Sequence, residues 1–161
     1  MRVERLLRSV DFERALGTPP RGRSAHFAVH HVAAGPAARR IQADGSKLST
    51  SQGTSGVQVV DDSAGAAPLP AAVRPAACWL GVVVPKRHAR RSVTRSLLKR
   101  EIRAGIVRHA ERLEAGLWVV RLRAPFDAQR YVSAASAALR RAARDELDLL
   151  FERAAARSRL A

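Results

Sequence analysis

Cationic side chains are the residues of this sequence best suited to chemistry, and many of them lie close together. Residues 79–112 carry ten basic and two acidic side chains, a net +8 out of the net +15 of the 161-residue chain. This concentration of positive charge favours a polyanionic partner. The side chains suited to contact its phosphates are Lys86, Arg87, Arg90, Arg91, Arg95, Lys99, Arg100 and Arg103.

The spacing within this stretch predicts a helix with an apolar line and a cationic line side by side. The apolar line is Leu98, Ile102 and Ile106, and the cationic line is Arg95, Lys99 and Arg103. Like charges at this spacing repel one another in isolation, whereas phosphates neutralise them and release counterions. A merely solvated charged face is the alternative. The scarcity of acidic residues favours nucleic-acid binding over it.

Groups that would make the protein itself a catalyst or a metal carrier do not form a motif. The sequence has no Gly-x-Ser-x-Gly turn, no Walker-type phosphate loop and no dinucleotide fingerprint. The one cysteine, Cys78, allows neither a disulfide within the chain nor a thiolate zinc site. On a strand, His26 and His30 share one face and His31 points away from them. We therefore expect neither a catalytic site nor a metal site on the protein.

The chain shows no segment directed to a membrane or to secretion. Its first residues are charged and are not followed by an apolar signal core, and no stretch approaches the ~18 apolar residues of a membrane span. With a single cysteine as well, a cytoplasmic location is the simplest expectation.

The order of the expected helices and strands around the cations predicts an α+β fold. In this fold a small sheet is covered by helices, in one domain over residues 1–161. Residues 34–76 interrupt it with five of the ten glycines and four of the eight prolines. They are expected to form a flexible, low-complexity insertion with at most a short strand at residues 58–60. The other expected elements are helices over 3–16, 92–112 and 132–157 and strands over 25–33, 78–84 and 116–123.

Residues 80–103, LGVVVPKRHARRSVTRSLLKREIR, resemble the signature of the protein subunit of bacterial ribonuclease P. In that family an apolar strand containing glycine precedes a basic pair and then an Arg- and Lys-rich helix. The similarity extends to RLLRSVDFERAL at residues 5–16, to HFAVHH at residues 26–31 and to GLWVVRLRAPF at residues 116–126. Five segments in the same order, the closing apolar helix included, make the resemblance specific. The resemblance covers nearly all of the chain except residues 34–76, which are longer than the usual loop.

Three motif positions differ from the family pattern. Pro85 stands where Ser or Ala is usual before the basic pair, Ser96 replaces an Asn, and Leu97 replaces an Arg. The serine retains a hydrogen-bonding group, whereas the leucine removes a cation. On a helical projection Leu97 is expected opposite the apolar line.

The resemblance implies a division of labour with RNA. In the family the RNA subunit hydrolyses the phosphodiester with bound magnesium ions, and the protein binds that RNA through its basic helix. The implied RNA-subunit contacts here are Lys86, Arg87, Arg90, Arg91, Arg95, Ser96, Lys99, Arg100 and Arg103. The family fold implies a sheet of about four strands and a left-handed βαβ crossover, an exception to the usual handedness.

The resemblance also implies a cleft between the first helix and the sheet that holds the single-stranded 5′ leader of precursor tRNA. Its positions here are Phe12, Leu16 and His30, where the family prefers aromatic residues. On the residues alone Phe12 would be a core residue. A general RNA-binding or ribosome-associated protein with no role in leader cleavage remains the alternative function. A membrane-surface protein is disfavoured because the apolar face of the basic helix lacks aromatics.

Overall fold

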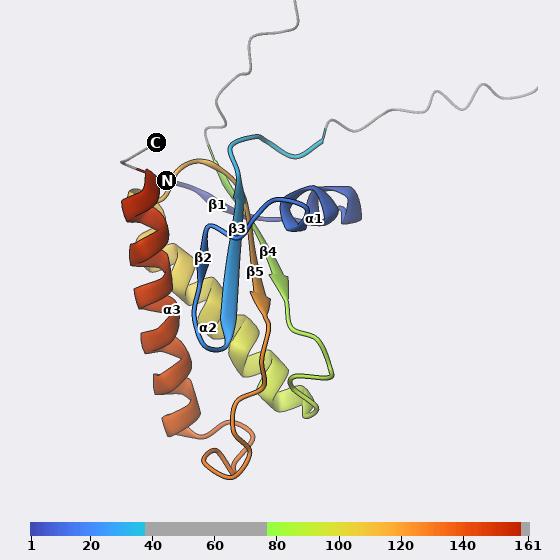
Figure 1. Ribbon diagram of the computed structural model, residues 1–161, viewed down its shortest axis with the longest axis vertical. Helices are drawn as coiled ribbons and strands as arrows, with labels where there is room; N and C mark the ends of the chain where they lie inside the picture. Colours follow the sequence, from blue (N-terminus) through green and yellow to red (C-terminus); the bar gives the residue numbers. More distant parts are fainter. Residues whose placement is uncertain (38–76, 159–161) are drawn as a thin grey trace, which may run out of the picture. The chain divides into compact units, whose positions relative to one another are not determined.

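The computed structural model describes residues 1–37 and 77–158, which form one compact unit around a five-stranded mixed sheet (Figure 1). The strand order is β1-β4-β5-β3-β2, with β1, β4 and β5 parallel and β3 and β2 antiparallel to their neighbours. The strands are β1 (Val3–Arg5), β2 (Gly22–Arg23), β3 (Phe27–Val32), β4 (Cys78–Val83) and β5 (Gly116–Leu122). The helices are α1 (Ser9–Leu16), α2 (Ser92–His109), the 3₁₀ turn η1 (Ala110–Arg112) and α3 (Ala137–Ser158).

Both faces of the sheet are covered. Trp118, Val120 and Leu122 of β5 belong to the larger core cluster, which includes residues of α2 and α3. Leu117 and Val119, with the opposite orientation, belong to a smaller cluster that contains Ala15 of α1. A strand buried on both sides must be apolar at successive positions, which explains the continuous apolar runs of β4 and β5. The α+β fold expected from the sequence is confirmed.

Two short edge strands make the sheet larger than the expected four strands. Residues 3–5, expected at the start of a helix, pair with β4 in the register Val3↔Cys78 instead. The Leu6 amide then donates to the Leu80 carbonyl at 2.9 Å. Pairing with an exposed strand edge overrides the local helical pattern because every edge amide and carbonyl needs a partner. The second edge strand, β2, pairs with β3.

Other element boundaries agree with the sequence except at the last helix. That helix begins at Ala137, not at residue 132. The segment before it consists of turns, and Leu139 N–H bonds the Ser136 hydroxyl at 3.1 Å, as at a capped helix start. Most of the expected insertion, residues 38–76 with the expected strand at 58–60, lies outside the described residues.

The parallel pair β4 and β5 is connected through α2, so this βαβ unit holds the basic helix against the sheet. The left-handed sense expected for this crossover stays a prediction. Leu98, Ile102 and Ile106 are fully buried, as the apolar line predicted.

The expectation for Leu97 is wrong, because its side chain is only 2% exposed and lies in the larger core cluster. The helix has a second neighbour besides the sheet. Glu101, on the same side of α2 as Leu97, faces Arg140 of α3 across 3.9 Å. Packing against α3 widens the buried arc of α2 beyond the single line that a helical projection suggests.

Candidate nucleic-acid interface

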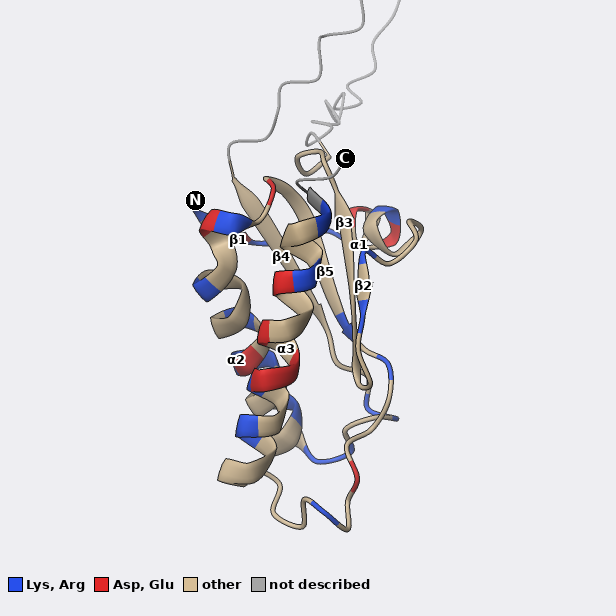
Figure 2. Cartoon of the chain, turned by 60° about the vertical axis from the view of Figure 1, so that its left-hand side comes forward, with Lys and Arg blue, Asp and Glu red and all other residues tan. Residues whose placement is uncertain are grey.

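The loop after β4 and the helix α2 carry the cations that the sequence singled out. Pro85 follows the strand, a turn spans residues 86–88, and α2 begins at Ser92. Figure 2 shows Lys and Arg positions along this loop and along α2, and both acidic and basic positions on α3. Arg95 and Lys99 are half-buried. The exposed members of the set are Lys86, Arg87, Arg90, Arg91, Ser96, Arg100 and Arg103.

These cations lack the carboxylate partners that other cations of the fold have. Arg108, near the end of α2, pairs with Asp148 at 2.6 Å, and Arg144 approaches the same carboxylate at 3.8 Å. Within the described part of the chain, none of the eight Lys and Arg residues between positions 86 and 103 forms an ion pair. Their field is therefore uncompensated by nearby acids, as suits a surface that binds phosphates.

Arg95 has a positioning contact as well as a charge. Its Nη1 donates to the Ala89 carbonyl at 3.0 Å and to the Arg90 carbonyl at 2.6 Å. The loop is thus attached to the first turn of the helix, so its cations are held in place by contacts within the protein. Preorganisation of this kind lowers the entropy lost on binding.

The three expected leader positions all lie on the α1 side of the sheet, but their environments differ. Phe12 and Leu16 are half-buried and pack against the smaller core cluster. His30 is only 8% exposed, and its Nδ1 lies 2.9 Å from the Thr18 carbonyl, just beyond the end of α1. The ring of His30 therefore contacts the backbone at the end of α1 and does not offer an open face for stacking.

Phe12 also lines a cavity of about 170 Å³ at the edge of β4, together with Arg5, Lys99 and Arg103. Strand β1 ends at Arg5, so β4 has no strand partner on this side beyond Leu80 within the described residues. At this open edge Phe12, from the α1 side of the sheet, lies near Lys99 and Arg103 of α2. Arg5 was not among the expected site residues, and its segment was expected to be helical.

Asp11, the residue before Phe12, ties α1 to the end of the described N-terminal segment. Its side chain is fully buried, and its Oδ1 accepts from the Ala37 amide at 2.8 Å. Its Oδ2 is buried without a hydrogen-bond partner among the residues described. Burying a carboxylate oxygen is costly, and the hydrogen bond from Ala37 satisfies one of the two oxygens of Asp11.

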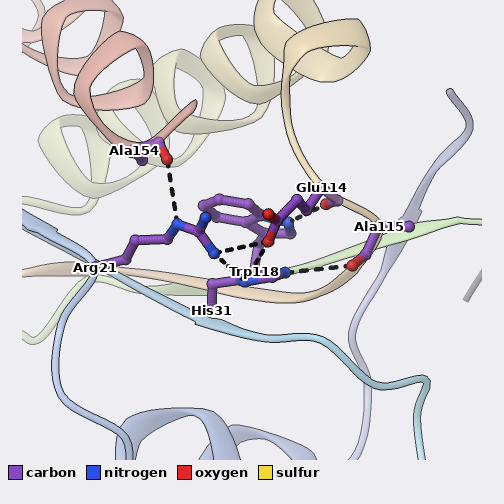
Figure 3. A network of polar contacts seen from close by, with 6 residues as sticks. All are labelled: Arg21, His31, Glu114, Ala115, Trp118 and Ala154. Atoms are coloured by element: carbon purple, nitrogen blue, oxygen red, sulfur yellow. Dashed lines mark hydrogen bonds and ion pairs between the residues drawn. The ribbon is translucent and has the colours of Figure 1, made fainter. Parts of the chain in front are cut away.

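The histidines of β3 serve separate polar contacts. His31 lies in a network with Arg21, Glu114 and Trp118, drawn in Figure 3. Its Nδ1 is 2.7 Å from Arg21 Nη1, and its Nε2 is 3.3 Å from the Ala115 carbonyl. Burial lowers the pKa of His31, the Ala115 carbonyl opposes that shift, and the nearby Arg21 charge adds to it. The neutral ring, donating from Nε2 and accepting at Nδ1, fits these contacts.

The remaining candidates for chemistry are engaged in packing. His26 pairs with Glu146 at 2.7 Å and stacks on Phe126 with ring centroids 3.9 Å apart. Burial raises the pKa of the Cys78 thiol to about 12. No group of three or more His, Cys, Asp or Glu residues in the ranges 1–37 and 77–158 is arranged to hold a metal ion. Over the same ranges, no helix has the length and apolarity needed to cross a bilayer.

Comparisons with known proteins identify the family of this chain. The family model described as Ribonuclease P matches residues 1–145. The ribonuclease P protein components of Bordetella parapertussis and Bordetella bronchiseptica are each 42% identical to this chain over 86 residues. That match covers 53% of this chain and 66% of the length of each relative. With most of its length matched by the family model, the chain belongs to the ribonuclease P protein family.

Proposed function

We propose that this protein is the protein subunit of ribonuclease P and promotes endonucleolytic removal of the 5′ leader from precursor tRNA. The observation that carries the proposal is the set of eight cations on the loop before α2 and on α2, none of which has a carboxylate partner among the described residues. Family membership supplies the identity of the RNA that such a surface would bind.

In this proposal the RNA subunit and its magnesium ions carry out the hydrolysis. The protein holds the RNA through the cations of the loop and of the helix. The hydrogen bonds of Arg95 keep the loop in a fixed position relative to the helix. Guanidinium groups suit this task because they donate two parallel hydrogen bonds to phosphate oxygens. Ser96, exposed on the same surface, would contribute a hydroxyl where the family pattern has an amide.

The leader is proposed to bind on the α1 side, with Phe12 as the stacking residue. Stacking on an aromatic ring contributes about 1–3 kcal/mol per base and tolerates any base, which suits leaders of many sequences. Leu16 offers apolar contact, and His30 acts by supporting α1. The cavity that Phe12 shares with Lys99 and Arg103 is a position where leader and RNA subunit would lie close together.

The test is cleavage of a precursor tRNA at low magnesium concentration by a bacterial ribonuclease P RNA, with and without this protein. The proposal predicts faster cleavage, with the cut at the mature 5′ end, and a preference for precursor over mature tRNA. Phe12→Ala should lose that preference and keep affinity for the RNA subunit. Tight RNA binding without stimulation, by the cognate RNA as well, would favour a general RNA-binding protein instead.

A further inference from the structure

A second cavity, of about 440 Å³, lies between the loop before α2 and the segment that joins β5 to α3. Its volume is within the range of about 300–1,000 Å³ that is typical of small-molecule sites. Cations and aromatic rings line it together, and no Asp or Glu is among its lining residues. The members that define its chemistry are Arg87, Arg90, Arg91, Phe126 and Tyr131.

Contacts between distant parts of the chain hold the walls of this cavity in place. Arg91 Nη1 donates to the Val132 carbonyl at 2.8 Å, and the Thr94 hydroxyl donates to the Ala134 carbonyl at the same distance. Phe126 is fixed from behind by its stack on His26. The segment after β5 is thereby attached to the first turn of α2, and contacts within the protein hold the two walls of the cavity together.

The aromatic side of the cavity has the geometry of a stacking site. Tyr131 meets Phe126 edge to face, with centroids 5.8 Å apart and planes at 80°. The guanidinium of Arg130 lies 5.5 Å from the centre of the Tyr131 ring. Tyr131 is half-buried and is one of the residues that line the cavity. An aromatic ring beside arginines is suited to a base and its phosphate together.

A base inside a duplex is stacked on its neighbours and cannot enter such a cavity, whereas an unpaired base in a loop or bulge can be splayed out. The cations of the cavity also belong to the surface proposed above for the RNA subunit, so its occupant would come from the same molecule. We propose that the cavity receives a single unpaired nucleotide of the RNA subunit, with its base against Tyr131 and its phosphate on Arg87 and Arg90. This inference rests on the proposed function.

The test measures affinity for the RNA subunit and maps base protection in the RNA at single-nucleotide resolution. Loss of one stacked base should weaken the affinity of Tyr131→Ala by roughly 5- to 150-fold. Protection of one unpaired nucleotide from a base-modifying reagent should disappear, while backbone protection along the α2 contact remains. Tyr131→Phe should keep both. Val107→Ala, an exposed position of α2 outside the cavity, is the control.

Tyr131→Leu keeps an apolar side chain in the wall and therefore separates loss of stacking from loss of folding. It should behave like Tyr131→Ala in both measurements, and a cooperative thermal unfolding transition should show that it remains folded. Wild-type affinity and an unchanged protection map in both variants would overturn the inference and leave the proposed function intact. A protected base in the tRNA leader would overturn the assignment to the RNA subunit. If the unmodified protein fails to bind the RNA subunit, both proposals fail.

Discussion

At the scale of single residues, the close contact between Phe12 and Gly81 fixes how near α1 lies to the sheet. A Cβ atom placed on Gly81 would be 2.5 Å from Phe12 Cε1 and 3.0 Å from Val119 Cγ2. Real Cβ atoms do not tolerate the first of these distances. Glycine in β4 therefore lets the phenylalanine that we propose for leader stacking pack directly over the strand.

Gly81→Ala should destabilise the protein by about 1–3 kcal/mol, because α1 or β4 must shift to relieve the overlap. It should also reduce the preference for precursor over mature tRNA, since Phe12 moves with α1. Urea unfolding and competition binding measure the two effects. Gly35→Ala is the matched control, because its added Cβ would meet the Trp79 ring at an ordinary 3.8 Å. Equal stability of the two variants would contradict the expected crowding.

Among the elements, α2 carries cations of two kinds. Those between its start and Arg103 have no acidic partner in the described structure, whereas Arg108 shares Asp148 with Arg144 of α3. Asp148 of α3 thus compensates cations at one end of α2, and the cations at the other end have no acidic partner among the described residues. Sequence alone shows that the helix is basic but not which of its cations are neutralised.

The double variant Lys99→Ala/Arg103→Ala should weaken RNA-subunit binding and make it less sensitive to salt. For every phosphate that is no longer neutralised, the slope of log affinity against log salt should fall in magnitude by roughly 0.7–0.9. The control, Arg108→Ala/Arg144→Ala, removes the same formal charge from cations that already face Asp148. Titrations at several salt concentrations give the slopes. Similar changes in the two double variants would mean that only total charge matters.

Across the whole molecule, the network in Figure 3 connects segments that lie far apart in the sequence. Arg21 donates to Glu114 at 2.9 Å and to the Ala154 carbonyl at 3.1 Å, and it contacts His31 as well. Its guanidinium also lies 5.7 Å from the centre of the Trp118 ring. One side chain therefore joins β3, β5 and α3, and the protonation of His31 should affect global stability.

His31→Phe keeps a ring against Trp118 but removes the titrating group and its hydrogen bonds. It should cost about 1–3 kcal/mol at pH 7.5. Because folding lowers the pKa of His31, its contribution is complete above the unfolded value of about 6.5 and is lost as pH falls through the folded pKa. The difference in unfolding free energy between the two proteins should therefore shrink from pH 7.5 to pH 5. A constant difference would mean that the His31 pKa is not lowered.

Local patterns in the sequence were enough to predict the central strands, the basic helix, its apolar line and the family to which the chain is related. Helical spacing, strand alternation of apolar and polar residues, and charge density can all be read from short stretches of sequence. Because β4 and β5 are buried on both faces, each also appears in the sequence as a continuous apolar run. Phe12 was singled out from the sequence through the residues that surround it in the family pattern, and its role in leader binding stays a prediction.

Contacts between remote segments, in contrast, could be known only from the folded chain. Val3–Arg5 became a strand because an edge of β4 lay beside it. Leu97 became a core residue through packing beside α3, and Arg5 joined Phe12 at an open strand edge. The cavity beside Tyr131 depends on the bond from Arg91 to Val132, 41 positions away. Such contacts form only after the chain has folded, so no periodicity within either segment predicts them.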